Sequence, residues 1–128
     1  MQYTKLLDTI PGVGVYSAVH IASAIGDITR FPSDEELASY AGIVPRTYQS
    51  GGTRIDKGLK HGDKLLRWIL VQDAYAAVRL SRRFRRLYMK SKRKKGPQKA
   101  IISVARKLVE IMYWMLTRGE PYNENYGQ

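Results

Sequence analysis

Apolar residues recur every three or four positions along most of this chain. That spacing fits an α-helix of 3.6 residues per turn. No stretch shows the alternation of apolar and polar residues that a half-buried strand would have. The apolar positions predict a helix ending at Leu7 and further helices over about 15–25, 63–80 and 97–117. The sequence therefore predicts an all-α fold in one domain, residues 1–119.

Capping and turn residues predict where these helices begin and end. Ser33 precedes Glu36 by three positions, which is the spacing of a capping box, so a short helix should run from there to Ala41. Gly96 with the proline after it should start the last helix, and Gly119 should end it. Residues 120–128 are polar and read as a tail with no packing signal.

The run IPGVG, residues 10–14, precedes a helix of small residues and is typical of a helix-hairpin-helix motif over about 3–26. Backbone amides of Gly12, Val13 and Gly14 would then face outward and hold one DNA phosphate without reading the bases. The alternative is a helical corner that only packs against the core. We favour the DNA-binding interpretation because the glycines lead directly into a helix.

The charge balance indicates a polyanionic partner. The chain holds 22 Lys and Arg against 11 Asp and Glu, a formal net charge of +11, and no cysteine. A domain this basic usually meets nucleic acid, and no apolar run reaches the roughly 18–20 residues that span a bilayer. No signal-peptide pattern opens the sequence. We expect a cytoplasmic protein with no membrane partner, and no metal site in this chain.

Residues 74–109 contain no acid, and this acid-free window is the densest charge feature of the chain. Such a run is often a solvated helix face, yet without counter-charges it repels itself, so a nucleic-acid backbone explains it better. We predict binding of DNA or RNA by Arg82, Arg83, Arg85 and Arg86. The window also holds Arg79, Lys90, Lys92, Arg93, Lys94, Lys95, Lys99, Arg106 and Lys107.

The segment YAGIVPRTYQSGG, residues 40–52, is the strongest candidate for chemistry, within a predicted catalytic loop over about 42–60. Ser50 is followed by two glycines that let a phosphodiester approach closely. The predicted phosphate-binding cations around it are Arg46, Arg54, Lys57 and Lys60. A hydroxyl among cations suits attack on an anion or binding of one, while the alternative is an ordinary flexible turn.

Asp73 lies near the apolar stripe of the helix predicted over 63–80. A buried acid needs a partner, so we predict that it pairs with a nearby arginine or with the loop. His61 is predicted to contact a phosphate or cap a helix, because it lies next to a glycine and far from an apparent catalytic partner.

The order of these motifs resembles one family along nearly the whole chain. The segments concerned are, in order, IPGVG, IGDITRFPS, LASYAGIVPRTYQSGG, HGDKLLRWILVQDAYAAVR and GPQKAIISVARKLVEIMYWML. Together they resemble the C-terminal domain of bacterial insertion-sequence transposases with an N-terminal RuvC-like DEDD domain. That group is described as bridge-RNA-guided recombinases. The resemblance implies that Ser50 is a nucleophile forming a phosphoserine link to DNA. It also implies Mg²⁺ on carboxylates of the other domain, a guide RNA, and a homo-oligomer of the full-length enzyme.

The segment after the glycine pair departs from the family pattern at Asp56 and Gly58, which we interpret as loop variation. This chain offers Ser50 no evident general base, so alone it is expected to bind DNA without cleaving it. Two alternatives remain. The chain could be a non-catalytic helix-hairpin-helix module for DNA or RNA, or Tyr48 could be the nucleophile, although the usual arginine and histidine constellation is missing around it.

Overall fold

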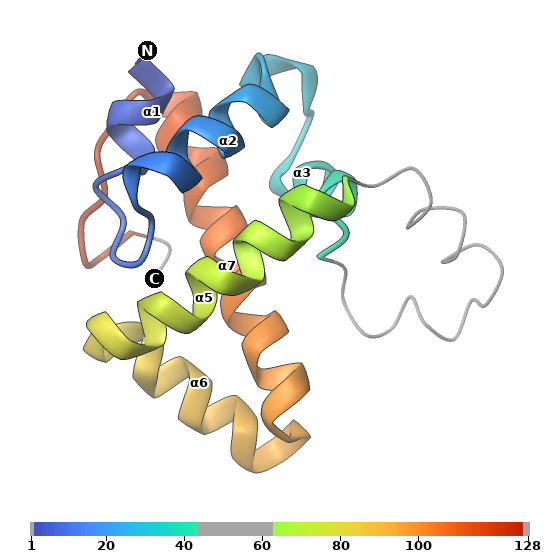
Figure 1. Cartoon of the computed structure of the whole chain (residues 1–128), viewed down its shortest axis with the longest axis vertical. Helices are drawn as coiled ribbons and strands as arrows, with labels where there is room; N and C mark the ends of the chain where they lie inside the picture. Colours follow the sequence, from blue (N-terminus) through green and yellow to red (C-terminus); the bar gives the residue numbers. More distant parts are fainter. Residues whose placement is uncertain (1, 44–62, 127–128) are drawn as a thin grey trace, which may run out of the picture.

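The computed structural model describes residues 2–43 and 63–126, and every regular element in these ranges is a helix (Figure 1). This confirms the all-α prediction for the described residues. The helices are α1 (Gln2–Leu7), α2 (Val15–Ile25), the short 3₁₀ helix η1 (Ile28–Arg30), α3 (Asp34–Tyr40), α5 (Lys64–Leu80), α6 (Arg82–Lys95) and α7 (Pro97–Arg118). Within these ranges no helix is both long and apolar enough to cross a bilayer.

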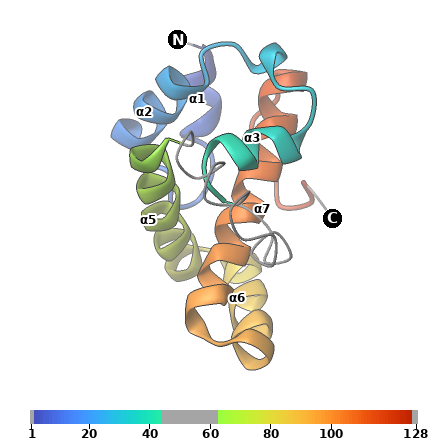
Figure 2. The ribbon, with the colours of Figure 1, turned by 90° about the vertical axis from the view of Figure 1, so that its right-hand side faces the viewer.

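Helix α7 is the centre of the fold and contacts α1, η1, α3, α5 and α6. It passes through the middle of the molecule in both ribbon views (Figures 1 and 2). Val104, Leu108, Ile111 and Met115 are fully buried along it. Their spacing of three and four residues places them on one helical face, so the apolar stripe predicted for the last helix does form the core.

The other helices lie on different sides of α7. Helices α2 and α5 lie in front of α7 in Figure 1 and to its left in Figure 2, and the two are in contact. Helix α6 folds back along the first half of α7, forming a helical hairpin at Gly96. This arrangement gives the molecule two separate surfaces, one made by α2 and α5 and the other by the outer face of α6.

Side-chain caps fix several of the helix boundaries. The Ser33 hydroxyl accepts a hydrogen bond from the Glu36 amide (3.3 Å), which confirms the predicted cap of α3, and Gly119 ends α7 in the left-handed region as expected. Ser81 lies between α5 and α6, and its hydroxyl accepts from the Phe84 amide (3.4 Å). Ser81 thus follows the end of α5, which was predicted near Leu80, and caps α6, a role that the sequence had not shown.

The C-terminal segment packs, contrary to the expectation of a tail without packing. Tyr126 is buried with 7% of its surface exposed, and the Tyr122 amide donates to the Thr9 hydroxyl (2.9 Å). Residues 120–126 therefore return the chain to the corner between α1 and α2. The expectation failed because the segment is polar in composition yet carries two tyrosines, which bury a large ring while keeping a polar end.

Candidate nucleic-acid interface

Six side chains of α6 line an open depression on the protein surface. They lie three or four residues apart and so share one helical face about 16 Å long. We call this set the basic stripe: Arg82, Arg85, Arg86, Met89, Lys90 and Arg93. The opposite face of α6 carries the fully buried Phe84. The helix is thus anchored by its apolar side and presents cations outward.

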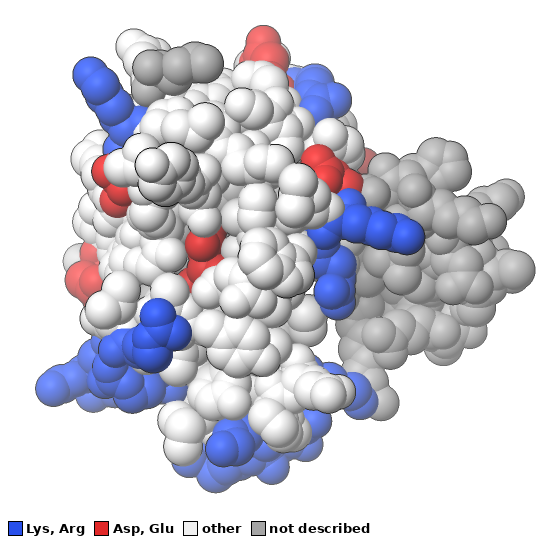
Figure 3. Space-filling view, in the orientation of Figure 1, with Lys and Arg blue, Asp and Glu red and all other residues white. Residues whose placement is uncertain are grey.

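The charge distribution separates this end of the molecule from the rest. Lys and Arg side chains gather over α6 at the lower end of the view, while the visible acids lie higher up (Figure 3). Lys90 and Arg93 continue the row begun by the predicted arginines. Their helical spacing from those arginines would have been enough to include them among the predicted nucleic-acid-binding residues. A helical face on which five of six side chains are cationic matches the backbone of a nucleic acid.

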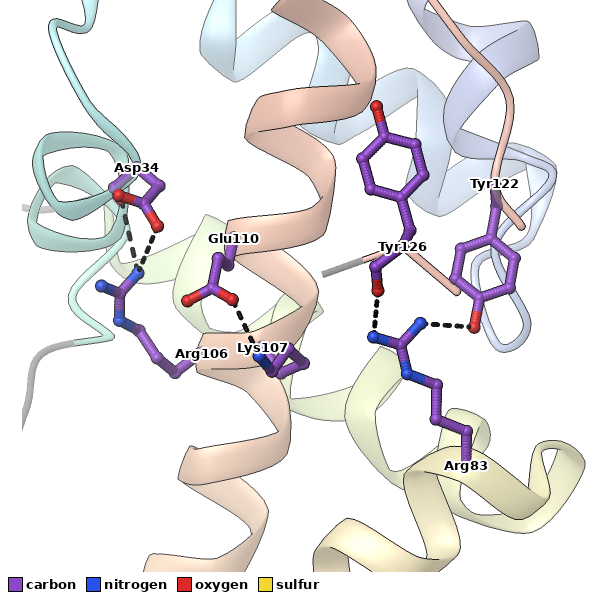
Figure 4. Close-up of polar contacts among 7 residues, drawn as sticks. All are labelled: Asp34, Arg83, Arg106, Lys107, Glu110, Tyr122 and Tyr126. Carbon is purple, nitrogen blue, oxygen red and sulfur yellow. Dashed lines mark hydrogen bonds and ion pairs between the residues drawn. The ribbon is translucent and has the colours of Figure 1, made fainter. Parts of the chain in front are cut away.

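Arg83 does not belong to the basic stripe, although the sequence placed it with the other three arginines. Its guanidinium donates to the Tyr122 hydroxyl (3.2 Å) and to the Tyr126 carbonyl, and it lies 5.4 Å from the ring centre of Phe84 (Figure 4). It therefore holds the C-terminal segment against α6. The other three arginines line the depression on the outer face.

The last two cations of the acid-free window have acidic partners from outside it. Arg106 pairs with Asp34 at the start of α3 (4.0 Å), and Lys107 pairs with Glu110 one turn further along α7 (2.8 Å) (Figure 4). Both pairs are partly shielded from water. These cations stabilise the contact of α3 with α7 and the surface of α7, so the predicted surplus of charge concentrates on α6.

The three hairpin residues 12–14 differ in their surroundings: the first two pack against the fold, and the third is exposed. Gly12 has a φ of +95°, and a Cβ there would lie 2.6 Å from the Ala77 nitrogen and 2.8 Å from the Asp73 carbonyl oxygen. The Val13 side chain is buried, and its amide donates to the Ile10 carbonyl (3.0 Å). Gly14 is exposed with open space around it. Of the three predicted phosphate contacts, Gly14 is the one at the surface.

Asp73 is buried, as the pattern predicted, but its partner is a serine from α2. The Ser17 hydroxyl donates to Asp73 Oδ1 at 2.7 Å, and Oδ2 has no hydrogen-bond partner among the described residues. Burial raises the pKa of Asp73 to about 6, while the Ser17 hydrogen bond opposes the rise. The expectation of an arginine partner was wrong, because the carboxyl faces α2, which contains no arginine.

Residues 44–60 of the predicted catalytic loop, which include Ser50 and Tyr48, lie outside the described residues, and so does His61. The same holds for the predicted cations Arg46, Arg54, Lys57 and Lys60. Their roles stay predictions. No cluster of three or more acids, histidines or cysteines that could hold a metal ion occurs in the described ranges 2–43 and 63–126.

The two points where the described chain meets this loop lie side by side. Gly42, with a φ of +75°, ends α3, and the Ile43 amide returns to the Ala38 carbonyl (2.8 Å) in a Schellman motif. The Asp63 amide donates to the Tyr40 carbonyl (2.9 Å), and Arg67 Nε donates to the Gly42 carbonyl (3.2 Å). These bonds fix both ends of the loop to the junction of α3 with α5.

A helical domain with a dense cationic stripe on an exposed helix falls in the class of polyanion-binding domains. Comparison with known proteins narrows this class. The chain belongs to the IS116/IS110/IS902 transposase family, whose model matches residues 4–89. This confirms, at the level of the family, the resemblance to insertion-sequence transposases.

Three relatives show the range of the similarity. The chain is 31% identical to the transposase for insertion sequence element IS1111A of Coxiella burnetii over 91% of its length. It is 37% identical to the pilin gene-inverting protein of Moraxella bovis over 94%, and 32% identical to an uncharacterized 43.6 kDa protein of insertion element IS110 of Streptomyces coelicolor over 93%. These alignments cover 33%, 38% and 30% of the respective relatives, so the chain spans about a third of their length.

Proposed function

We propose that this chain is the DNA-binding and nucleophile-bearing part of a transposase that cleaves and rejoins DNA through a serine–DNA intermediate. The observation that supports the DNA-binding part of this proposal is the basic stripe on α6. The cleavage and rejoining of DNA are supported by family membership and by relatives named as a transposase and a gene-inverting protein. The assignment of Ser50 rests on the resemblance of its loop to the family motif.

The basic stripe suits a phosphate backbone in length and charge. Its roughly 16 Å correspond to about five phosphates of one strand, which are spaced about 3.4 Å along a duplex axis. Arg82, Arg86 and Arg93 lie on this face without an acidic neighbour on α6. Contacts of this kind hold DNA in place but do not read its sequence, so sequence choice must come from elsewhere, and we propose a guide RNA for it.

The start of α2 is a second proposed phosphate contact. Gly14 precedes the helix in an extended conformation, and no side chain caps the first turn there. Uncapped amides at a helix start favour an anion, and the missing Cβ at Gly14 leaves the approach open. This is the part of the helix-hairpin-helix hypothesis that we retain, with Gly12 serving the packing of the corner.

The proposed chemistry is one phosphoryl transfer and its reversal. The Ser50 oxygen forms a bond to phosphorus and loses its proton, while the bond to the leaving sugar oxygen breaks and that oxygen takes up a proton. Mg²⁺ on carboxylates of a RuvC-like domain would supply charge stabilisation at the phosphate. The contribution of this chain is to supply the hydroxyl, hold the DNA, and fix the loop ends between α3 and α5.

We propose as partners DNA, a guide RNA, a RuvC-like domain in the same full-length protein, and further copies of that protein. The proposed location is the bacterial nucleoid. A non-catalytic DNA- or RNA-binding module is the second candidate, and the basic stripe favours it equally, since binding needs no contribution from the loop.

Denaturing electrophoresis tests the serine mechanism. Full-length protein carrying this domain is incubated with labelled target DNA, guide RNA and Mg²⁺, and protein–DNA adducts that survive denaturation are counted. The wild type and Tyr48→Phe should form the adduct, while Ser50→Ala should form none yet still bind DNA. An adduct that persists in Ser50→Ala and vanishes in Tyr48→Phe would assign the nucleophile to Tyr48. Absence of any adduct in the wild type would favour the non-catalytic module.

A further inference from the structure

Helices α2 and α5 together expose an unusual number of large apolar side chains. Tyr16 is 92% exposed and Trp68 is 59% exposed. We call the set of six the apolar face: Val15, Tyr16 and Val19 from α2, and Leu65, Trp68 and Tyr75 from α5. The two helices are neighbours, joined by the hydrogen bond between Ser17 and Asp73 (2.7 Å), and both lie in front of α7 in Figure 1 and to its left in Figure 2.

The apolar face is nearly free of charge in a chain of net charge +11. Helix α2 contains no Lys, Arg, Asp or Glu, and between Trp68 and Val78 the sole charged residue is the buried Asp73. The space-filling view shows a broad area without cations over these helices, with Lys and Arg at its margins (Figure 3). Nucleic acid is therefore a poor occupant, since its binding depends on cations.

We infer that the apolar face is the surface through which two copies of this chain associate. Two strongly basic molecules repel each other, so they meet at least cost through a surface that carries no net charge. A two-fold interface also requires a patch that complements itself, and an uncharged apolar patch does so without a matching second surface. The aromatic enrichment and depletion of Lys and Glu are those of interface centres.

The size of the apolar face suits this role. Its three aromatic side chains, each of about 150–250 Å² in full, supply a large share of the roughly 800 Å² that each partner of a typical interface buries. The basic stripe lies beyond this face at the lower end of the molecule (Figure 3). Association through α2 and α5 would therefore leave one stripe per copy open to DNA, as joining two DNA sites requires. This inference rests on the association with further copies that is part of the proposed function, and it names the surface through which they associate.

Analytical ultracentrifugation of the chain without nucleic acid tests the inference. At rising protein concentration, and in salt high enough to screen repulsion, the mass should move from 14.6 kDa toward twice that value. Tyr16→Lys and Trp68→Lys each add a positive charge to the apolar face of both copies. Both variants should stay monomeric, with unchanged helix content and melting temperature because both side chains are exposed.

Leu80→Lys is the matched control, because Leu80 is 69% exposed on α5 but lies outside the apolar face. This variant should associate like the wild type. Association that survives both Tyr16→Lys and Trp68→Lys would overturn the assigned surface and leave self-association standing. A wild-type chain that stays monomeric at all concentrations would overturn the inference while leaving self-association of the full-length protein standing, and binding of that monomer to phosphatidylcholine vesicles would assign the face to lipid. DNA affinity, measured separately, reports on the proposed DNA contacts, which are the basic stripe and Gly14.

Discussion

Gly12 sets the corner between α1 and α2 because the backbone of α5 lies directly against it. Gly12→Ala would place a methyl group 2.6 Å from the Ala77 nitrogen in a backbone conformation that alanine disfavours. We expect a loss of about 3 kcal/mol or more of unfolding free energy, combining strain with overpacking. Urea denaturation followed by circular dichroism measures it.

Gly14→Ala is the control for this prediction, because no atom lies within 4 Å of a Cβ at that position and its φ is negative. Its stability should change by about 1 kcal/mol at most. Equal losses in the two variants would show that Gly12 is not held against α5 as described. Weakened DNA binding in a stably folded Gly14 variant would support the phosphate contact at the start of α2.

Asp73 should make the stability of the fold depend on pH. Its pKa is raised by burial from 3.8 to about 6, so the folded state holds the proton more tightly than the unfolded chain. The stabilising contribution is complete below about pH 4 and is lost as the pH rises through about 6. The loss is on the order of 3 kcal/mol, at about 1.4 kcal/mol for each pKa unit. Thermal melting at about pH 4 and about pH 8 measures it against Asp73→Asn.

Asp73→Asn keeps an acceptor for the Ser17 hydroxyl but cannot ionise. The variant should lose the part of the pH dependence that lies between about 4 and about 6 and should be the more stable protein at high pH. Identical pH profiles for the two proteins would contradict a buried ionising carboxyl. Hydrophobic spacing predicted the burial of Asp73, but Ser17 lies 56 positions away, and no local pattern reveals so distant a partner.

At the scale of elements, the C-terminal segment and α6 hold each other. Tyr126 is buried and its carbonyl accepts from Arg83, which also lies near the ring of Phe84. Tyr126→Ala should cost roughly 2 to 4 kcal/mol, since a large side chain is removed from a packed site. Asn125→Ala, at an exposed neighbouring position, should change stability little. Equal effects on the denaturation midpoint would mean that the segment does not pack as described.

Helix boundaries could be predicted where a local signal sets them. The Ser33 cap and the glycines that end α2 and α7 act within one turn, so the sequence shows them. The end of α5 near Leu80 was predicted too, but the cap that Ser81 gives α6 was not, because only its hydroxyl marks the start of that helix. The packing of Tyr122 and Tyr126 was missed for another reason. It depends on contacts with residues far away in the chain, whereas the composition of the segment is polar.

At the scale of the whole molecule, charge and apolar surface are separated. Composition alone predicted a nucleic-acid partner, and the acid-free window located most of the cations. Which cations face outward could not be predicted, because that depends on the side of α6 that packs against α7. Arg83, Arg106 and Lys107 prove to hold the fold together, while the basic stripe stays open. Of the predicted catalytic loop, the structure describes only the ends, which are fixed at the junction of α3 with α5.

The salt dependence of DNA binding tests the central claim, that the basic stripe holds a nucleic-acid backbone. Affinity for duplexes of unrelated sequence should fall steeply with salt, with a slope of about −0.9 in log K against log salt for each phosphate contacted. Arg82→Gln with Arg86→Gln should flatten the slope by about 1 to 2. Lys5→Gln with Arg118→Gln removes the same charge from exposed sites on α1 and α7 and should leave the slope nearly unchanged. Equal slopes for wild type and the α6 variant, or equal losses in both double variants, would contradict the account.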